Sequence, residues 1–167
     1  MTPLALVIDH EACWGCLACE VACKQEHNAD PGVKLIRVLE EEARDSGGRL
    51  SFTFRVSACR HGECEGTPCA DACPTDAITV RDDGIVVMHV GECVGCMACV
   101  TLCPDEAIAV NARRSITQKS NLCHHRVDGG LLPACADNVC LAHCIYFGEP
   151  AEIQPRIEAR RKVRERH

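Results

Sequence analysis

Four cysteines near the middle of the chain have a spacing that supports one specific chemistry. They form a C-x2-C-x2-C-x3-C run followed by Pro104, and they are Cys93, Cys96, Cys99 and Cys103. Gaps of two residues let one tight loop bring three thiolates to three corners of a 4Fe–4S cubane, while the fourth cysteine turns away toward another cluster. The run therefore indicates iron–sulfur ligation, and one such run predicts a second cluster.

Two further cysteine runs precede it. The N-terminal run has the same spacing with Lys24 in place of proline, and its members are Cys13, Cys16, Cys19 and Cys23. The next run has longer gaps but the same C-x3-C-P ending, and its members are Cys59, Cys64, Cys69 and Cys73. Zinc sites usually pair two C-x2-C hooks across a longer loop, so a zinc knuckle is the weaker alternative for the N-terminal run.

An internal repeat shows how two of these runs belong together. Residues 74–80 (PTDAITV) and 104–110 (PDEAIAV) correspond, and each predicts a short turn followed by a strand. In such a two-cluster unit, the fourth cysteine of each run ligates the other cluster. The expected ligand sets are Cys59, Cys64, Cys69 and Cys103 for one cluster, and Cys93, Cys96, Cys99 and Cys73 for the other.

The last four cysteines are spaced more loosely, and only Cys23 remains to complete their sites. Under the same crossing rule, we expect a third and a fourth cluster that bring the two ends of the chain together. The third set is Cys13, Cys16, Cys19 and Cys144, and the fourth is Cys123, Cys135, Cys140 and Cys23.

Composition limits the other functions. Sixteen cysteines in 167 residues would also suit a secreted disulfide scaffold, but the N-terminus has no basic region before its short apolar run and no cleavage site. We therefore expect a reducing, cytoplasmic setting. No apolar run approaches the roughly 18 residues of a membrane helix, so no direct membrane insertion is expected. The net charge of -6 argues against nucleic-acid binding.

The elements that must position these cysteines are short. Residues 4–8 predict a buried strand, and residues 33–39 and 50–56 predict a hairpin that places four side chains on one face. That face is predicted to pack against the body, with a docking surface as the alternative. Its members are Leu50, Phe52, Phe54 and Val56.

These signals predict an α+β fold of two interleaved two-cluster units, each made of short strands, short helices and cluster loops. The outer unit comprises residues 1–57 and 111–148, and the inner unit comprises residues 58–110. Residues 149–167 form a basic tail. With five aromatic residues the core is thin, so metal–thiolate bonds are expected to replace part of it. The tail is predicted to be a solvated helix, and a basic arm that docks on an acidic partner is the alternative.

At the level of motifs, the chain resembles the four-cluster ferredoxin-type iron–sulfur subunits of molybdenum and tungsten pterin oxidoreductases. The resemblance spans about residues 5–148 and rests on IDHEACWGC (8–16), ACKQEHN (22–28), ACRH (58–61), TPC (67–69), ACPTDAI (72–78), RVDGG (126–130), PAC (133–135) and IYFG (145–148). It implies an electron-transfer subunit in a hetero-oligomer with a large pterin subunit and a further electron carrier. More narrowly, the chain is similar to the small subunits that accompany tungsten aldehyde oxidoreductase-type proteins, including the benzoyl-coenzyme A reductase complex of strict anaerobes.

Two departures from that pattern bear on the sites. Four residues separate Cys59 from Cys64 where the family usually has two, and Ser120 stands where the last run should begin. Cys140 stands as far before the IYFG segment as the last cysteine does in the family. Cys144 instead follows the preceding cysteine after three intervening residues, as the fourth cysteine of the other runs does. Either is therefore a candidate crossing ligand. We favour Cys144, since it leaves four thiols for each site. Three to four 4Fe–4S clusters are expected, with zinc, a 3Fe–4S cluster or no metal as alternatives at the Cys123 site.

The remaining polar residues give no sign of catalysis by this chain. His61, His124, His125 and His143 adjoin cysteines, but sixteen thiols already satisfy four cubanes, so we expect these rings to be solvated or to surround the clusters. Trp14 is expected to cover a cluster or to lie in the core. The chain has no Gly-rich phosphate loop and no Ser/His/Asp arrangement. Alternatives to an electron-transfer subunit are a free-standing polyferredoxin and, less favoured, a zinc-stabilised interaction module.

Overall fold

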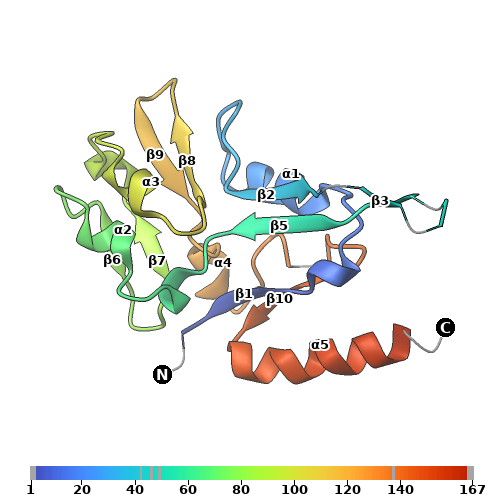
Figure 1. The fold of residues 1–167 in the computed structure, drawn as a ribbon. Helices are drawn as coiled ribbons and strands as arrows, with labels where there is room; N and C mark the ends of the chain where they lie inside the picture. Colours follow the sequence, from blue (N-terminus) through green and yellow to red (C-terminus); the bar gives the residue numbers. More distant parts are fainter. Residues whose placement is uncertain (1–2, 42, 46, 49, 137, 165–167) are drawn as a thin grey trace.

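The computed structural model describes residues 3–41, 43–45, 47–48, 50–136 and 138–164 (Figure 1). Within these residues the strands pair as two-stranded antiparallel sheets, and the helices are short except at the C-terminus. The strands are β1 (Ala5–Ile8), β2 (Ile36–Glu40), β3 (Arg44–Asp45), β4 (Leu50–Ser51), β5 (Phe54–Ala58), β6 (Ile78–Val80), β7 (Val86–Met88), β8 (Ile108–Asn111), β9 (Ile116–Lys119) and β10 (Ile145–Gly148). The α-helices are α1 (Ala18–Glu26), α2 (Pro68–Asp71), α3 (Ala98–Leu102), α4 (His124–Val127) and α5 (Pro150–Arg164), and the 3-10 helices are η1 (His10–Ala12), η2 (His61–Glu63) and η3 (Val90–Glu92). The predicted α+β class is confirmed.

The internal repeat folds as two similar hairpins. The strand expected in residues 74–80 is β6, which pairs with β7, and the one expected in 104–110 is β8, which pairs with β9. Helices α2 and α3, which precede these strands, contact each other. Ile78, Val86 and Ile108 form a small buried core together with Cys69 and Cys99. This arrangement brings two of the cysteine runs face to face.

The two ends of the described chain meet, because β1 pairs with β10 along its whole length. Helix α5 lies along this pair, with the side chains of Ile153 and Ile157 buried against it. Val163, further along the same helix, is exposed. The division of the chain into an outer unit, an inner unit and a tail remains a prediction.

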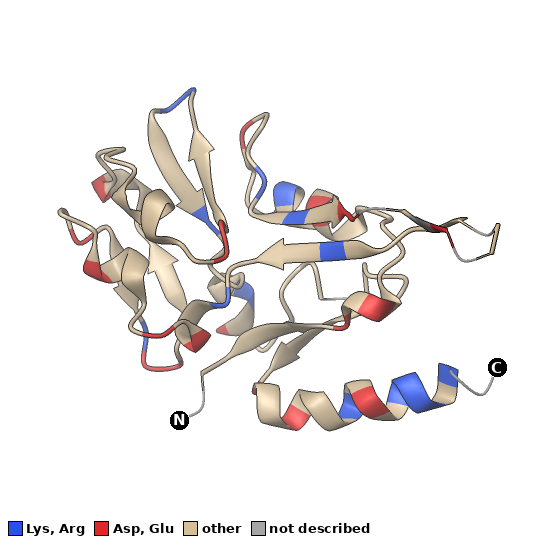
Figure 2. Ribbon diagram, viewed as in Figure 1, with Lys and Arg blue, Asp and Glu red and all other residues tan. Residues whose placement is uncertain are grey.

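Basic residues gather in the C-terminal half of α5 (Figure 2), where two arginines pair with acidic residues of the same chain. Arg161 donates to Asp9 at 2.6 Å and to Glu11 at 3.0 Å, and Arg164 also pairs with Asp9. The carboxylate of Asp9 is buried, and these two arginines hold its pKa below the usual value although burial alone would raise it. The tail is therefore bound to the loop before Cys13 and is not simply solvated.

The predicted hairpin is present, but its apolar face is only partly buried. Strands β2 and β5 pair with Val38 opposite Val56, and Val56 is buried. Leu50 and Phe52 are exposed, so the prediction that they pack was wrong. Near the tip, the described residues form the short β3–β4 ladder, which projects from the body (Figure 1).

The base of this hairpin is fixed to the first cysteine run. A Cβ atom on Gly15 would lie 2.4 Å from the ring of Phe54, so this glycine permits the contact. The carboxylate of Glu20 in α1 accepts a hydrogen bond from the backbone N–H of Val38 at 2.7 Å. None of the described helices has both the length and the hydropathy to span a membrane.

Candidate iron–sulfur sites

The two regular cysteine runs share one backbone conformation. Gly15 and Gly95 adopt positive φ, as do Leu17 and Met97, which immediately precede helices α1 and α3. Two left-handed residues in each loop reverse its direction, so that cysteines two residues apart face a common space. At position 95 only glycine fits, because a Cβ atom there would lie 2.1 Å from the carbonyl oxygen of Ser115.

One inner cavity gathers the cysteines expected for the regular run. About 300 Å³ of empty space, part of it open to solvent, is lined by Cys73, Cys93, Cys96 and Cys99. Cys73 reaches this cavity from the end of α2, as the crossing rule requires. The sequence did not reveal Thr117, whose hydroxyl lies 3.5 Å from the sulfur of Cys93 and 3.4 Å from that of Cys99. Burial alone would raise the pKa of Cys93, but hydrogen bonds from Thr117 hold it below the usual value.

A second inner cavity gathers the other expected set. About 340 Å³ of empty space is lined by Cys59, Cys64, Cys69 and Cys103, together with His61 and Lys119. Burial raises the pKa of Cys69 to about 11. The longer gap between Cys59 and Cys64 forms η2, so the extra residues are accommodated without moving either thiol out of the cavity.

Five cysteines gather at the outer site nearest β1 and α5. The sulfurs of Cys140 and Cys144 are 3.4 Å apart. Burial and then the charge of Cys140 raise the pKa of Cys19, to about 12, with smaller contributions from Cys13 and Cys16. Burial and the contacts with Cys140 and Cys13 raise the pKa of Cys144. Both candidates for the crossing position therefore lie at this site.

The other three cysteines are Cys23, Cys123 and Cys135. Burial and then the charges of Cys123 and Cys19 raise the pKa of Cys23 to about 12. Burial and then the charges of Cys23, Cys123 and Cys19 raise the pKa of Cys135. His27, which sequence reasoning had passed over, lies with Nε2 3.3 Å from the sulfur of Cys123. It follows Cys23 by one helical turn and lies in the ACKQEHN segment that supports the family resemblance. The hydroxyl of Ser120 accepts a hydrogen bond from the backbone N–H of Leu122 at 3.3 Å.

One contact differs from what the expected outer sets imply. Cys140 was expected with Cys23, Cys123 and Cys135, but its sulfur contacts Cys144. The short C-x3-C turn is the physical reason, since the backbone N–H of Cys144 donates to the sulfur of Cys140 at 3.4 Å. Ligation by each of the sixteen cysteines remains a prediction.

The cavities suit clusters better than single ions. Within the described part of the chain, no three His, Cys, Asp or Glu side chains converge on the position of one metal ion. Nε2 of His61 is buried without a hydrogen-bond partner among those residues, beside a cavity lined by four thiols. A buried polar atom of this kind calls for an acceptor, and the sulfurs of a 4Fe–4S cluster supply one. The donor sets therefore fit 4Fe–4S clusters.

Comparison with known proteins identifies the family. The sequence pattern of the 4Fe–4S dicluster domain matches residues 50–150. This protein belongs to the 4Fe–4S dicluster domain family. The match includes both inner cavities and the last cysteine run, so multiple 4Fe–4S clusters are the cofactors of the protein.

Named relatives agree with this membership. The dicluster protein is 34% identical to a polysulfide reductase component of Wolinella succinogenes, over 91% of this chain and 79% of the relative. It is 34% identical to the thiosulfate reductase electron transfer subunit of Salmonella typhi, over 87% of this chain and 77% of the relative. A Halobacterium salinarum protein assigned as the iron-sulfur subunit of a dimethyl sulfoxide reductase is 37% identical, over 89% of this chain and 67% of that protein. The resemblance to iron–sulfur subunits of reductases is thereby confirmed.

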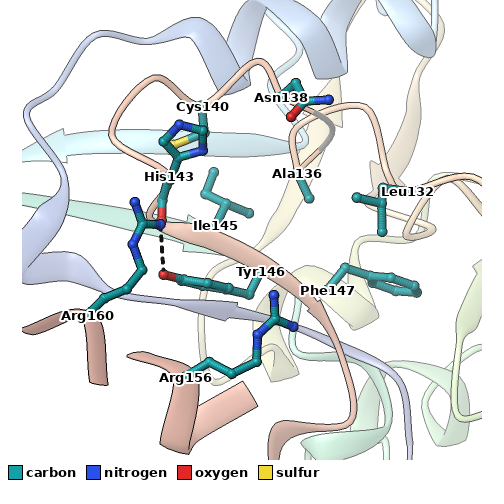
Figure 3. Close-up of a pocket in the computed structure, with 10 residues that line it drawn as sticks. All are labelled: Leu132, Ala136, Asn138, Cys140, His143, Ile145, Tyr146, Phe147, Arg156 and Arg160. Atoms are coloured by element: carbon teal, nitrogen blue, oxygen red, sulfur yellow. Dashed lines mark hydrogen bonds between the residues drawn. The ribbon is translucent and has the colours of Figure 1, made fainter. Parts of the chain in front are cut away.

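The other singled-out side chains surround these sites. His61 is buried and not solvated, while His125 in α4 contacts Glu26 at 2.7 Å. Figure 3 shows His143 and Cys140 in a surface pocket where Arg160 donates to the hydroxyl of Tyr146. The side chain of Trp14 is 60% exposed, so its placement in the core was wrong. Whether it covers a cluster remains a prediction.

We expect the Cys123 site of the dicluster protein to be the most labile, because Ser120 stands where the last cysteine run should begin. Brief exposure to air should lower the iron content from about sixteen toward about twelve atoms per chain, with sulfide falling in step. Iron and sulfide analysis of the anaerobic and the exposed protein measures this change. Ser120→Cys, which restores a fourth cysteine, should resist the loss. Iron loss shared evenly among all sites would contradict the expectation.

Proposed function

We propose that this dicluster protein is the electron-transfer subunit of an oxidoreductase complex, relaying electrons to or from a molybdenum or tungsten pterin catalytic subunit. One observation carries the proposal. Cys73 and Cys103 cross between two adjacent cavities, each of which gathers four cysteines. Because 4Fe–4S clusters accept and release single electrons, two neighbouring cluster sites make a path for electrons. The relatives named as reductase components, one of them an electron transfer subunit, support this role.

The residues of this chain position the clusters and set their surroundings, and we propose that substrate chemistry takes place in the partner. Contact between α2 and α3 sets the separation of the two inner sites. Buried cysteines exclude water from the thiolates at the outer sites, as the raised pKa values of Cys19 and Cys23 reflect. A cofactor performs the redox step, while the protein supplies binding, orientation and electrostatics.

The partner is proposed more narrowly as a tungsten pterin protein of the aldehyde oxidoreductase type, such as that of the benzoyl-coenzyme A reductase complex. The motifs of the sequence support this choice, particularly Ser120 and the stretched last run. A second electron carrier would complete the hetero-oligomer. We place the protein in the cytoplasm of an anaerobic cell, where its many exposed and half-buried thiols remain reduced.

Anaerobic affinity purification of the full chain from its own cells tests the proposal. We expect a large subunit to co-purify in fixed ratio, and we expect mass spectrometry and metal analysis to find tungsten and a pterin in it. Molybdenum would retain the electron-transfer role and overturn the narrower choice. Iron and sulfide in a chain without any partner would indicate a free-standing polyferredoxin. Zinc with little iron or sulfide would overturn the cluster role altogether.

A further inference from the structure

The buried imidazole of His61 has a fixed orientation and one N–H group without an acceptor among the described residues. Its Nδ1 accepts a hydrogen bond from the backbone N–H of Val86 at 3.0 Å, so that nitrogen carries no hydrogen. A neutral imidazole accepts at one nitrogen and donates at the other, so Nε2 bears the hydrogen. Within the described residues Nε2 has no partner, and His61 is 1% exposed. A buried donor without an acceptor is destabilising.

Lys119 lies beside the same cavity and is also buried, with 4% of its surface exposed. Its ammonium donates to the carbonyl oxygens of Val86 at 2.6 Å and Ser120 at 2.7 Å. In the described part of the chain, no carboxylate forms an ion pair with it. Asp105 also lines the cavity, but its carboxylate pairs with Arg60 at 2.7 Å. Burying an unpaired charge is expensive, so the site calls for negative charge nearby. Four thiols line the cavity, and they become thiolates when they bind iron.

Val86 connects these two side chains. Its N–H group holds the imidazole of His61, and its carbonyl oxygen holds the ammonium of Lys119. Since Val86 belongs to β7 and Lys119 to β9, the two hairpins of the inner repeat fix both groups at one cavity. Both groups are therefore built into the framework around this one site.

The neighbouring cavity is different. Cys73, Cys93, Cys96 and Cys99 are surrounded by apolar side chains and by the hydroxyls of Thr75 and Thr117, and no charged side chain of the described residues lines that space. The two inner sites therefore differ in electrostatics although they are related by the internal repeat. A positive charge and a hydrogen bond to sulfur both stabilise a cluster that has gained an electron. The hydroxyl of Thr117 lies within hydrogen-bond distance of two sulfurs at the neighbouring site, so the buried charge of Lys119 is the larger difference between the two sites.

We infer that His61 and Lys119 raise the reduction potential of the cluster held by Cys59, Cys64, Cys69 and Cys103 above that of its neighbour. In this role Nε2 of His61 donates a hydrogen bond to a sulfur atom of that cluster, and Lys119 supplies a buried positive charge. An electron shared by the two inner clusters is then found mainly on the Cys59 cluster. The inference rests on the proposed function, because it requires that both sites hold redox-active clusters.

Redox titration followed by electron paramagnetic resonance tests this, using the full chain with its clusters under anaerobic conditions. Cys64→Ala identifies the titration step of the Cys59 cluster by its disappearance. In His61→Asn the side-chain oxygen still accepts from Val86 but the donor at Nε2 is lost, whereas His61→Gln keeps an N–H near Nε2. Lys119→Met removes the charge at similar length, and Lys119→Arg keeps it. His89→Asn, at an exposed histidine that directly follows β7, is the control.

We expect His61→Asn and Lys119→Met each to raise the oxidised-to-reduced ratio of the Cys59 cluster at least tenfold at fixed potential. This corresponds to a decrease of about 59 mV in its reduction potential for a one-electron step. The step of the Cys93 cluster should stay in place, and His61→Gln, Lys119→Arg and His89→Asn should resemble the unaltered protein. An unchanged step in both the Asn and Met variants, with their iron retained, would overturn the inference.

The unaltered protein gives a second test that does not depend on whether the variants fold. Its Cys59 cluster should become reduced at a higher potential than its Cys93 cluster, and the reverse order would overturn the inference. Either negative result leaves the proposed electron-transfer role intact. Absence of any iron–sulfur signal from the unaltered protein would instead overturn the proposed function itself.

Discussion

Removal of iron with a chelator and a reductant is expected to unfold this protein. Nine cysteines are among its buried side chains, and within the described residues none of the five aromatic side chains is buried. The strands form two-stranded sheets, which are marginally stable without further packing. A structural zinc site contributes about 10–16 kcal/mol to a zinc-finger peptide, as much as the roughly 5–15 kcal/mol that stabilises a whole domain. Without its clusters the fold therefore loses more than its entire net stability.

Circular dichroism of the anaerobic protein before and after chelation measures this effect. The cluster-free chain should lose most of its helical signal and its cooperative thermal transition. Iron and sulfide added back under reducing conditions should restore both, which controls for irreversible damage by the chelator. A cluster-free chain that retains a native spectrum and a cooperative transition would show that the apolar core is sufficient alone.

The inner sites were predictable from sequence because their geometry is local and repeated. The x2 gaps, Gly95 and the C-x3-C-P endings define a loop whose conformation depends on neighbouring residues, and the structure gathers both expected inner cysteine sets. The crossing of Cys73 and Cys103 followed from the repeat of residues 74–80 and 104–110. These features need no knowledge of distant contacts.

The outer sites were harder to predict because they depend on contacts between distant segments. Cys140 and Cys144 both satisfy a plausible spacing, and only the turn that joins them and the pairing of β10 with β1 decide where they lie. Strand β9 carries no cysteine and was not predicted, so Thr117 and Lys119 were missed with it. Leu50 and Phe52 alternate as a buried strand would, but nothing in the described chain covers the tip of that hairpin.

Replacing Cys73 by Ala is expected to damage the cluster of Cys93, Cys96 and Cys99. The cluster of Cys59, Cys64 and Cys69, which belong to the same run as Cys73, should remain. The thiol of Cys73 lines the Cys93 cavity, and hydrogen bonds from Thr75 and nearby backbone groups hold its pKa below the usual value, although burial alone would raise it. A thiol held in this way is readily deprotonated for iron binding. Its loss leaves three thiolates at that site, so the cluster should become a 3Fe–4S cluster or be lost.

Cluster-resolved electron paramagnetic resonance with iron analysis distinguishes the two sites in this variant. The Cys93 signal should disappear or change to that of a three-iron cluster, while the Cys59 signal remains. Cys103→Ala is the matched control, because Cys103 lines the opposite cavity and its loss should damage only the Cys59 cluster. The backbone N–H of Ala107 donates to the sulfur of Cys103 at 3.3 Å, so each crossing cysteine is held by the turn that follows it. Loss of the Cys59 cluster alone in Cys73→Ala would mean that the four cysteines of each run ligate a single cluster. The electron path between the inner sites would then lack the crossed ligands that keep the two clusters adjacent.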